Sequence, residues 1–267
     1  MIATVCPDDC IVKDYIVFSV CVLMEGGNES QYEGQFFENY LKLRAKPDNF
    51  NDLLEFPAFV ALLPDLTGKS VLDLGCGFGP HAKYYVEQGA SKVTGVDISE
   101  KMLEHARKIN SDSKITYVHR DISDPSIIDL GKYDIVCSSL TIHYIEDLFS
   151  LFKNIAQVLD SGSVFLFSME HPIATANNDE GRVNNLTDGY MLKHYSEEGL
   201  RKGEWIGAPI EKYHHKFMTV MNALIEAGFV IDKVMEPMPS KRLMKKVPRM
   251  KKQINRPSYL IVRSIKR

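Results

Sequence analysis

Short apolar runs alternate with segments whose apolar residues recur at helical spacing, from about residue 69 onward. Runs of this length bounded by glycine or polar residues predict strands, and two of them are apolar almost throughout, as strands covered on both faces are. The predicted strands are Lys69–Leu74, Val93–Asp97, Ile115–His119, Tyr133–Cys137 and Ser163–Met169. Alternation of strand and helix predicts a mostly parallel sheet with helices on both faces.

The intervening helices have recognisable ends. Ser99 is a typical N-cap for a helix that continues to about Ile109. A second helix is predicted over Glu146–Leu159, with Gly162 as its stop signal.

The alternation breaks after the fifth predicted strand, between His171 and Lys212. A gap of this length in a compact domain is typically functional or disordered. The pattern then resumes with the helix Phe217–Ala227 and two closely spaced strands, Phe229–Val234 and Tyr259–Ser264, which could pair antiparallel. We therefore predict an α/β, Rossmann-like fold with a seven-stranded mostly parallel sheet, an antiparallel last strand and an inserted cap over residues 171–213.

The N-terminal part has a different character. Gln35–Leu63 has a helical pattern in two pieces, interrupted at Pro47 and around Pro57. The first residues fit either a peripheral extension or an edge strand over Ile11–Leu23. The predicted organisation is an extension over 1–23, a helical segment over 24–66 and the main domain over 67–267.

Composition narrows the class of protein. The chain has 267 residues, 45% of them hydrophobic and 25% charged, which is typical of a globular protein. A net charge of −3 gives no overall attraction to nucleic acid. The longest apolar stretch, Tyr15–Met24, is about half the length a bilayer requires, so no membrane helix is expected. The five cysteines show no metal-ligand spacing, which predicts no disulfide framework, no metal and a reducing cytoplasm.

The strongest chemical signal is the run Val71–Gly79, in which a buried strand leads into three glycines at alternate positions before Pro80. Glycines allow close approach of a ligand to the backbone, and the following helix start offers unpaired N–H groups. Asp97 follows Gly77 by twenty residues at the end of the next strand, where a carboxylate suits a ribose. A bound nucleoside is predicted, and the G-x-G-x-G spacing disfavours a dinucleotide such as NAD.

The motif Asp73-Leu-Gly-Cys-Gly-Phe-Gly79 resembles the first motif of the class I S-adenosylmethionine-dependent methyltransferases. Gly95-Val-Asp97-Ile98, Arg120-Asp121-Ile122 and the segment from Asp134 through Ser138 resemble the next three. The resemblance implies S-adenosyl-L-methionine as cofactor, with Asp97 on the ribose, Ile98 and Ile122 at the adenine, Asp121 on the adenine amino group and Ser138 beside the methionine part. The implied cofactor-binding residues are Asp73, Gly75, Gly77, Asp97, Ile98, Asp121, Ile122 and Ser138.

A narrower resemblance links the chain to a small-molecule subgroup of these enzymes. It is carried by Glu170-His171-Pro172, Trp205, Lys212-Tyr213-His214-His215 and Arg256-Pro257, with His215 standing where the subgroup has arginine. Tyr40–Arg44 and Glu55–Pro57 resemble its lid helices, and Arg44 is a candidate contact for the cofactor carboxylate. The implied acceptor is a small molecule, methylated on oxygen or nitrogen.

Histidines are the candidate bases, because an acceptor hydroxyl or ammonium must lose a proton. His171 and His214 are predicted to act as bases at the pocket mouth; the alternative is that each fixes a loop by a hydrogen bond to a backbone carbonyl. His143, Trp205 and Tyr213 are predicted to line the acceptor site, although the two aromatics would serve equally as packing anchors.

A basic run, Lys241–Arg256, carries eight positive charges and no acid. It is predicted to be a solvated loop, able to attract a phosphate backbone or an anionic substrate. Methylation of RNA through this run is the alternative function, although no aromatic residues are interleaved for base stacking. A cofactor-binding protein without turnover is a third possibility. Nucleic-acid and membrane partners are not expected.

Overall fold

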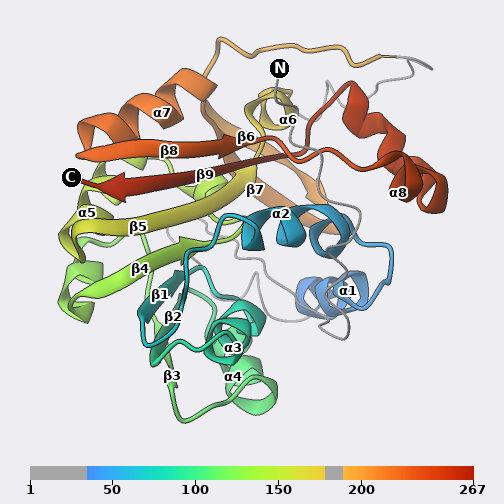
Figure 1. The fold of residues 1–267 in the computed structure, drawn as a ribbon. Coiled ribbons are helices and arrows are strands. Elements are labelled where there is room, and N and C mark those ends of the chain that lie inside the picture. The colour runs from blue at the N-terminus through green and yellow to red at the C-terminus, as the bar shows by residue number, and fades with distance from the viewer. Residues whose placement is uncertain (1–34, 178–188) are drawn as a thin grey trace.

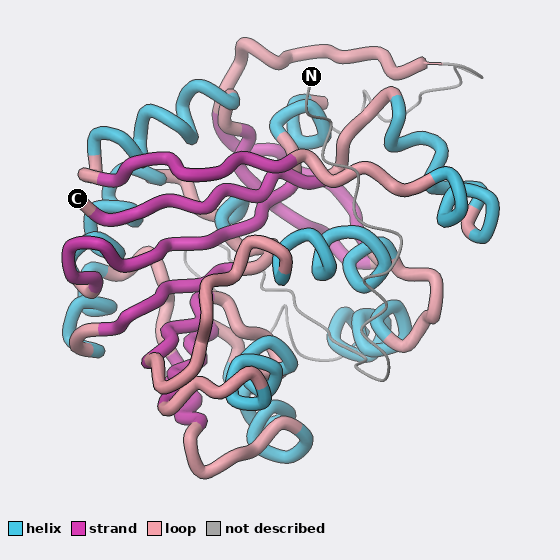
Figure 2. Tube along the Cα trace, in the orientation of Figure 1, coloured by secondary structure: helices cyan, strands magenta, loops and turns pink. Residues whose placement is uncertain are grey.

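The computed structural model describes residues 35–177 and 189–267, so the predicted extension over 1–23 and residues 24–34 lie outside the described part. Its centre is a seven-stranded sheet with strand order β3-β2-β1-β4-β5-β9-β8 (Figures 1 and 2). The strands are β1 (Ser70–Leu74), β2 (Lys92–Asp97), β3 (Ile115–His119), β4 (Tyr133–Ser138), β5 (Leu159–Glu170), β8 (Phe229–Met235) and β9 (Tyr259–Lys266).

The first five strands of the sheet run parallel, and β9 pairs antiparallel with both β5 and β8. The predicted Rossmann-like class and the antiparallel last strand are confirmed. Because parallel strands all end at the same edge, the segments that follow β1, β2, β3 and β4 come together there.

Helices cover both faces of the sheet. The α-helices are α1 (Gln35–Arg44), α2 (Phe56–Val60), α3 (Pro80–Glu87), α4 (Glu100–Ile109), α5 (Leu148–Gln157), α6 (Pro172–Ala176), α7 (Phe217–Glu226) and α8 (Lys241–Lys246). Three 3₁₀ segments, η3 (Pro125–Leu130), η4 (Ile142–Tyr144) and η6 (Pro248–Ile254), and a π-helical turn, η2 (Asn51–Glu55), complete them.

Successive side chains of β1 point to opposite faces of the sheet, and each face has its own apolar cluster. Leu72 and Leu74 pack in one apolar cluster with residues of α4, α5 and α7, whereas Val71 packs in the other with residues of α2 and α3. At the opposite end of the molecule from α5 and α7, α1, α2 and α8 gather beyond the carboxyl ends of the parallel strands (Figure 1). No helix in the described ranges has the length and apolar character needed to cross a bilayer.

Local signals explain most element boundaries. The predicted cap of α4 is present, since Ser99 Oγ accepts a hydrogen bond from Met102 N at 3.2 Å. α1 ends before Pro47, and Pro57 lies in the first turn of α2, where its missing N–H is tolerated. The chain therefore passes from a π-helical turn into an α-helix at Pro57 without a break.

The predicted end of the α5 helix was wrong. α5 ends at Gln157, and β5 already begins at Leu159, which pairs with Tyr133. The register then shifts, and Gly162, with φ 85°, lies inside this irregular stretch of β5 rather than at the helix end. A glycine with positive φ suits either place, so the sequence did not distinguish them.

Two further segments differ from the sequence expectation. The insertion contains an antiparallel hairpin, β6 (Gly199–Trp205) and β7 (Ala208–His214), joined by Ile206 and Gly207, which both have positive φ. The basic run is not a loop but forms α8 and η6; Val247, which joins them, and Met250 and Gln253 of η6 are buried. Burial at every third residue is the period of a 3₁₀ helix lying against a core.

Candidate active site

The turn after β1 has room for glycine only. Gly75 has φ 73°, and a Cβ built on it would lie 2.1 Å from Thr141 Oγ1. At Gly79, φ is 81° and a Cβ would lie 2.0 Å from the Tyr117 hydroxyl. The close packing of this turn against the β3 and β4 regions leads the backbone directly into α3 at Pro80. The N-terminus of α3 thereby faces the same edge as the strand ends.

Asp97 at the end of β2 fixes the conformation of this turn. Its Oδ2 accepts a hydrogen bond from Gly77 N at 2.8 Å, and its Oδ1 accepts one from Ser99 N at 2.9 Å. The side chain is almost completely buried. Since a carboxylate can accept about four hydrogen bonds, a ribose with its two hydroxyls is compatible with these contacts.

Asp73, on β1, carries an unsatisfied buried oxygen. Among the described residues its Oδ2 has no hydrogen-bond partner, and the side chain is 1% exposed. Burial, together with the nearby Asp97, raises its pKa to about 8. A buried carboxyl group in this state is destabilising unless a donor or cation binds it. An ammonium group, such as that of a bound amino acid moiety, fits this chemistry.

The remaining predicted cofactor residues follow the neighbouring strands. Asp121, after β3, accepts hydrogen bonds from Ser123 N and Ser123 Oγ, both at 2.8 Å. Ile98 follows Asp97 and is partly buried, and Ile122 is fully buried. Ser138 Oγ donates to Leu74 O at 2.8 Å and joins the ends of β4 and β1. The structure therefore brings the predicted set together along one sheet edge.

Helix α1 covers the glycine turn. Tyr40 is fully buried, and its ring lies 6.1 Å from that of Phe78, within the turn, and 6.1 Å from that of Trp205 in the hairpin. The ring of Phe37 lies edge-on to His105 of α4 at 5.7 Å. These contacts place α1 over the turn, which is the position that the resemblance to lid helices predicts.

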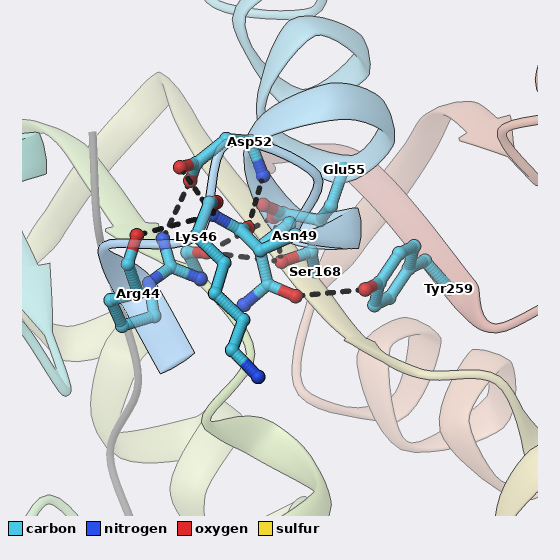
Figure 3. A network of polar contacts seen from close by, with 9 residues as sticks. Arg44, Lys46, Asn49, Asp52, Glu55, Ser168 and Tyr259 are labelled. Carbon is cyan, nitrogen blue, oxygen red and sulfur yellow. Dashed lines mark hydrogen bonds and ion pairs between the residues drawn. The ribbon is translucent and has the colours of Figure 1, made fainter. Parts of the chain in front are cut away.

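Hydrogen bonds hold the lid segment together and join it to the sheet (Figure 3). Arg44 Nη2 pairs with Asp52 Oδ1 at 2.7 Å, and Tyr259 on β9 donates to Asn51 Oδ1 at 2.8 Å. Glu55, which sequence analysis did not single out for this role, is 1% exposed and accepts from the hydroxyls of Ser139 and Ser168. Burial raises the pKa of Glu55 to about 7 despite these hydrogen bonds.

A cavity of about 240 Å³ lies beside the strand ends. Its walls come from the lid, the loop after β4, the end of β5, the hairpin and the η6 segment. The loop after β4 contributes Leu140, His143 and Tyr144, directly after the predicted cofactor residue Ser138. Trp205 and Glu170 also line it, and so do four cationic residues, Arg44, Arg249, Lys252 and Arg256.

His143 and Glu170 form the polar part of this cavity. His143 Nδ1 accepts from Glu170 N at 3.2 Å, and His143 Nε2 lies 4.0 Å from Glu170 Oε1. Burial lowers the pKa of His143 to about 4, so the ring is neutral at physiological pH. For Glu170, burial acts to raise the pKa, but Lys212 and His143 outweigh it and hold the pKa at about 2. Lys212 Nζ pairs with Glu170 Oε2 at 2.5 Å.

The structure places His171 and His214, the predicted bases, outside the set of residues that line this cavity. His171 Nδ1 accepts from Ile173 N at 3.1 Å and caps α6, while its Nε2 bonds Glu236 at 2.8 Å. His214 Nδ1 and Nε2 bond Thr175 Oγ1 at 2.9 Å and Tyr195 O at 3.0 Å. Because both ring nitrogens already form hydrogen bonds, neither imidazole can take a proton from the substrate without losing one of these contacts. His214 has the contact of the alternative interpretation, a bond to a backbone carbonyl, whereas His171 bonds a backbone N–H and the Glu236 carboxylate.

Tyr213, a predicted acceptor-site residue, and its neighbour His215 also lie outside the cavity lining. The Tyr213 hydroxyl lies 3.4 Å from Glu146 Oε2, and Tyr213 is not among the lining residues. His215 Nε2 bonds Ile145 O at 2.8 Å, so the position at which arginine was expected supports the loop after β4. The basic run was predicted to be able to attract an anionic substrate, but the positions of Arg249, Lys252 and Arg256 in the cavity lining were not predicted. These three residues are spaced by three and four positions, as on one helical face.

Comparison with known proteins agrees with this geometry. A methyltransferase domain family matches residues 72–167. An uncharacterized protein of Haemophilus influenzae is 40% identical over 212 residues, covering 76% of this chain and 84% of that protein. A ubiquinone biosynthesis O-methyltransferase of Vibrio parahaemolyticus is 34% identical over 105 residues, covering 39% of this chain and 44% of that enzyme.

Among solved structures, an S-adenosylmethionine-dependent methyltransferase from Mesorhizobium loti has a TM-score of 0.73 and 37% identity, covering 79% of this chain and 97% of that one. The chain belongs to the class I S-adenosylmethionine-dependent methyltransferases. It is a methyltransferase enzyme, and S-adenosylmethionine is its cofactor.

Proposed function

We propose that this enzyme methylates an oxygen or nitrogen atom of a small-molecule acceptor bound in the cavity next to the strand ends. The observation that carries the proposal is the position of the 240 Å³ cavity. Its lining includes Leu140, which is only two residues after the proposed cofactor residue Ser138. A volume just below the ~300–1,000 Å³ usual for ligand pockets suits a small acceptor. The O-methyltransferase activity of the Vibrio relative supports the choice of oxygen as the acceptor atom.

In this proposal the eight predicted residues hold the cofactor. Asp97 binds the ribose, Ile98 and Ile122 flank the adenine with Asp121 on its amino group, and Asp73 binds the ammonium group. Gly75 and Gly77 keep the backbone close, and Ser138 lies beside the methionine part. S-adenosylmethionine supplies an electrophilic methyl group, so the protein needs no nucleophilic side chain.

In this proposal the cavity residues orient the acceptor, whose reacting atom either binds already deprotonated or releases its proton to water. Because His143 Nδ1 accepts from Glu170 N, a neutral ring carries its proton on Nε2 and acts as a donor. Glu170, with its pKa held at about 2, is a weak base but a strong acceptor of hydrogen bonds. We therefore assign the pair to positioning, an effect that can contribute roughly 7–11 kcal/mol to lowering a barrier.

The alternative of RNA methylation receives less support. Three cations of the basic segment, Arg249, Lys252 and Arg256, line the cavity. An RNA contact would instead favour cations arranged along an open surface with interleaved aromatic residues.

The test uses an ultrafiltered small-molecule extract and a tRNA fraction, each incubated with enzyme and cofactor labelled in the methyl group. We expect label in a small organic product and none in tRNA. The Asp97→Asn variant should lose the product, and Asp129→Asn, on the exposed part of η3, should retain it. Label in tRNA alone, or binding of S-adenosylhomocysteine without any labelled small molecule, would refute the proposal.

A further inference from the structure

The cavity of the proposed acceptor site is lined by more positive than negative charge. Its cations are Arg44, Arg249, Lys252 and Arg256, and Glu170 is its acid. Arg44 is paired with Asp52, and Arg249 with Asp48 at 2.9 Å, so both of these charges are balanced within the protein.

Lys252 and Arg256 are not balanced in this way. Within the described residues, neither forms an ion pair with a carboxylate. They lie instead over aromatic rings, Lys252 at 5.2 Å from the centre of Phe50 and Arg256 at 5.3 Å from the centre of Tyr190. Such contacts orient a cation without neutralising it.

The guanidinium of Arg256 has a further unmet requirement. Its Nε is buried and has no hydrogen-bond partner among the described residues. A buried donor left in this state destabilises a protein by about 1–3 kcal/mol, so an acceptor atom supplied by a ligand would be stabilised at this place.

The acid of the cavity is already satisfied. Glu170 is bonded by Lys212 and approached by His143, and Arg256 also contributes to lowering its pKa. The cations, in contrast, affect one another: burial and the charges of Arg256 and Arg249 lower the pKa of Lys252. The cations therefore repel one another, and an anion placed between them would relieve that repulsion.

We propose that the acceptor is a small organic anion whose carboxylate or phosphate group binds Lys252 and Arg256. This rests on the proposed function and specifies the chemical class of its substrate. Either an oxygen of the anionic group is the atom that is methylated, or the anionic group is an anchor that orients a second group of the acceptor toward the cofactor. The planar guanidinium of Arg256 suits two-point binding of such a group, and Lys252 adds a point charge.

The first experiment measures binding by calorimetry on the enzyme loaded with S-adenosylhomocysteine. The probes are benzoate, succinate and phenyl phosphate, with benzamide as the neutral counterpart of benzoate. We expect at least one anion to bind and benzamide to bind about tenfold or more weakly than benzoate. Equal binding of benzoate and benzamide, or no binding of any anion, would overturn the proposal.

Charge-removing variants assign the effect to the residues. Lys252→Gln and Arg256→Gln should each weaken anion binding about tenfold and leave the affinity for S-adenosylhomocysteine unchanged. Lys251→Gln is the matched control, because Lys251 and Lys252 are adjacent and both exposed, but only Lys252 lines the cavity. Unchanged anion affinity in both cavity variants, or an equal loss in the control, would overturn the assignment.

The second experiment separates this inference from the proposed function. The ultrafiltered extract is passed over an anion exchanger, and the bound and unbound fractions are assayed for methyl transfer. Acceptor activity in the bound fraction supports an anionic substrate. Activity only in the unbound fraction would overturn this inference but preserve the small-molecule function, and label found only in tRNA would overturn both.

Discussion

The carboxyl group of Glu55, in the segment before α2, accepts a hydrogen bond from the hydroxyl of Ser168 on β5, 113 positions further along the chain. Ser139, which follows β4, donates to the same Glu55 oxygen at 3.0 Å. One buried acid thus connects the lid segment to the ends of two central strands. This connection borders the cavity, because Leu140 follows Ser139 directly, lines the cavity and donates its backbone N–H to Ser168 Oγ at 3.0 Å.

The stability of this connection should depend on pH. Burial raises the pKa of Glu55 from 4.5 to about 7, so between these values the folded protein holds a proton that the unfolded chain releases. The contribution of Glu55 is therefore fully present below about pH 4.5 and is lost as the pH rises through about 7. Glu55→Gln, which stays neutral, should gain stability relative to wild type on going from about pH 5 to about pH 8, by on the order of 3 kcal/mol.

Urea unfolding of both proteins at the two pH values measures this difference. Glu226→Gln is the control, since Glu226 is exposed on α7. The assignment is wrong if the stability difference between Glu55→Gln and wild type is the same at both pH values.

The fold could be predicted because its signals are local. The apolar runs of β1 and β2, the Ser99 cap and the alternate glycines each require only a few consecutive residues. The position of the proposed cofactor residues was predictable for the same reason, since every one of them stands at or directly after a strand end. Parallel strands end at the same edge of the sheet, so the topology alone predicts that these residues lie near one another.

The acceptor side could not be predicted in this way, because it depends on long-range contacts. His171 and His214 have the chemistry of bases, and only their partners Glu236, Thr175 and Tyr195 reveal a structural role. Similarly, the basic run contains no acidic residue that would indicate a partner. Composition does not predict that this run packs against the lid and that Arg249 and Lys252 line the cavity.

Substitutions at two glycines should separate backbone strain from steric conflict. Gly68 and Gly75 both have φ of 73°, but a Cβ at Gly68 meets nothing within 4 Å, whereas at Gly75 it would lie 2.1 Å from Thr141 Oγ1. Gly68→Ala should destabilise the protein by roughly 1–2 kcal/mol through strain alone. Gly75→Ala should cost more in urea unfolding and should also weaken binding of S-adenosylhomocysteine. Equal losses at the two positions would show that Thr141 moves aside freely.

The ribose assignment of Asp97 makes a quantitative prediction. Asp97→Asn removes the charge and replaces one oxygen with a donor that cannot accept from Gly77 N or Ser99 N. The affinity for S-adenosylhomocysteine should fall tenfold or more, which corresponds to about 1.4 kcal/mol. Calorimetry at a temperature where circular dichroism shows the variant folded makes the measurement. The Asp129→Asn control should bind as wild type does, and a variant at Asp97 with wild-type affinity would contradict the assignment.

Two histidines with different surroundings should respond differently to the same change. His143 lines the cavity, so His143→Gln should lower kcat or raise KM for methyl transfer to the small-molecule fraction without changing stability in proportion. His214 is fully buried with both nitrogens bonded, so His214→Gln should reduce the unfolding free energy by about 1–3 kcal/mol while kcat/KM of the folded fraction stays within a few-fold of wild type. If His214 were a base, His214→Gln would instead lower kcat by about 10²–10⁴-fold and leave the stability unchanged. That result would identify His214 as the proton acceptor.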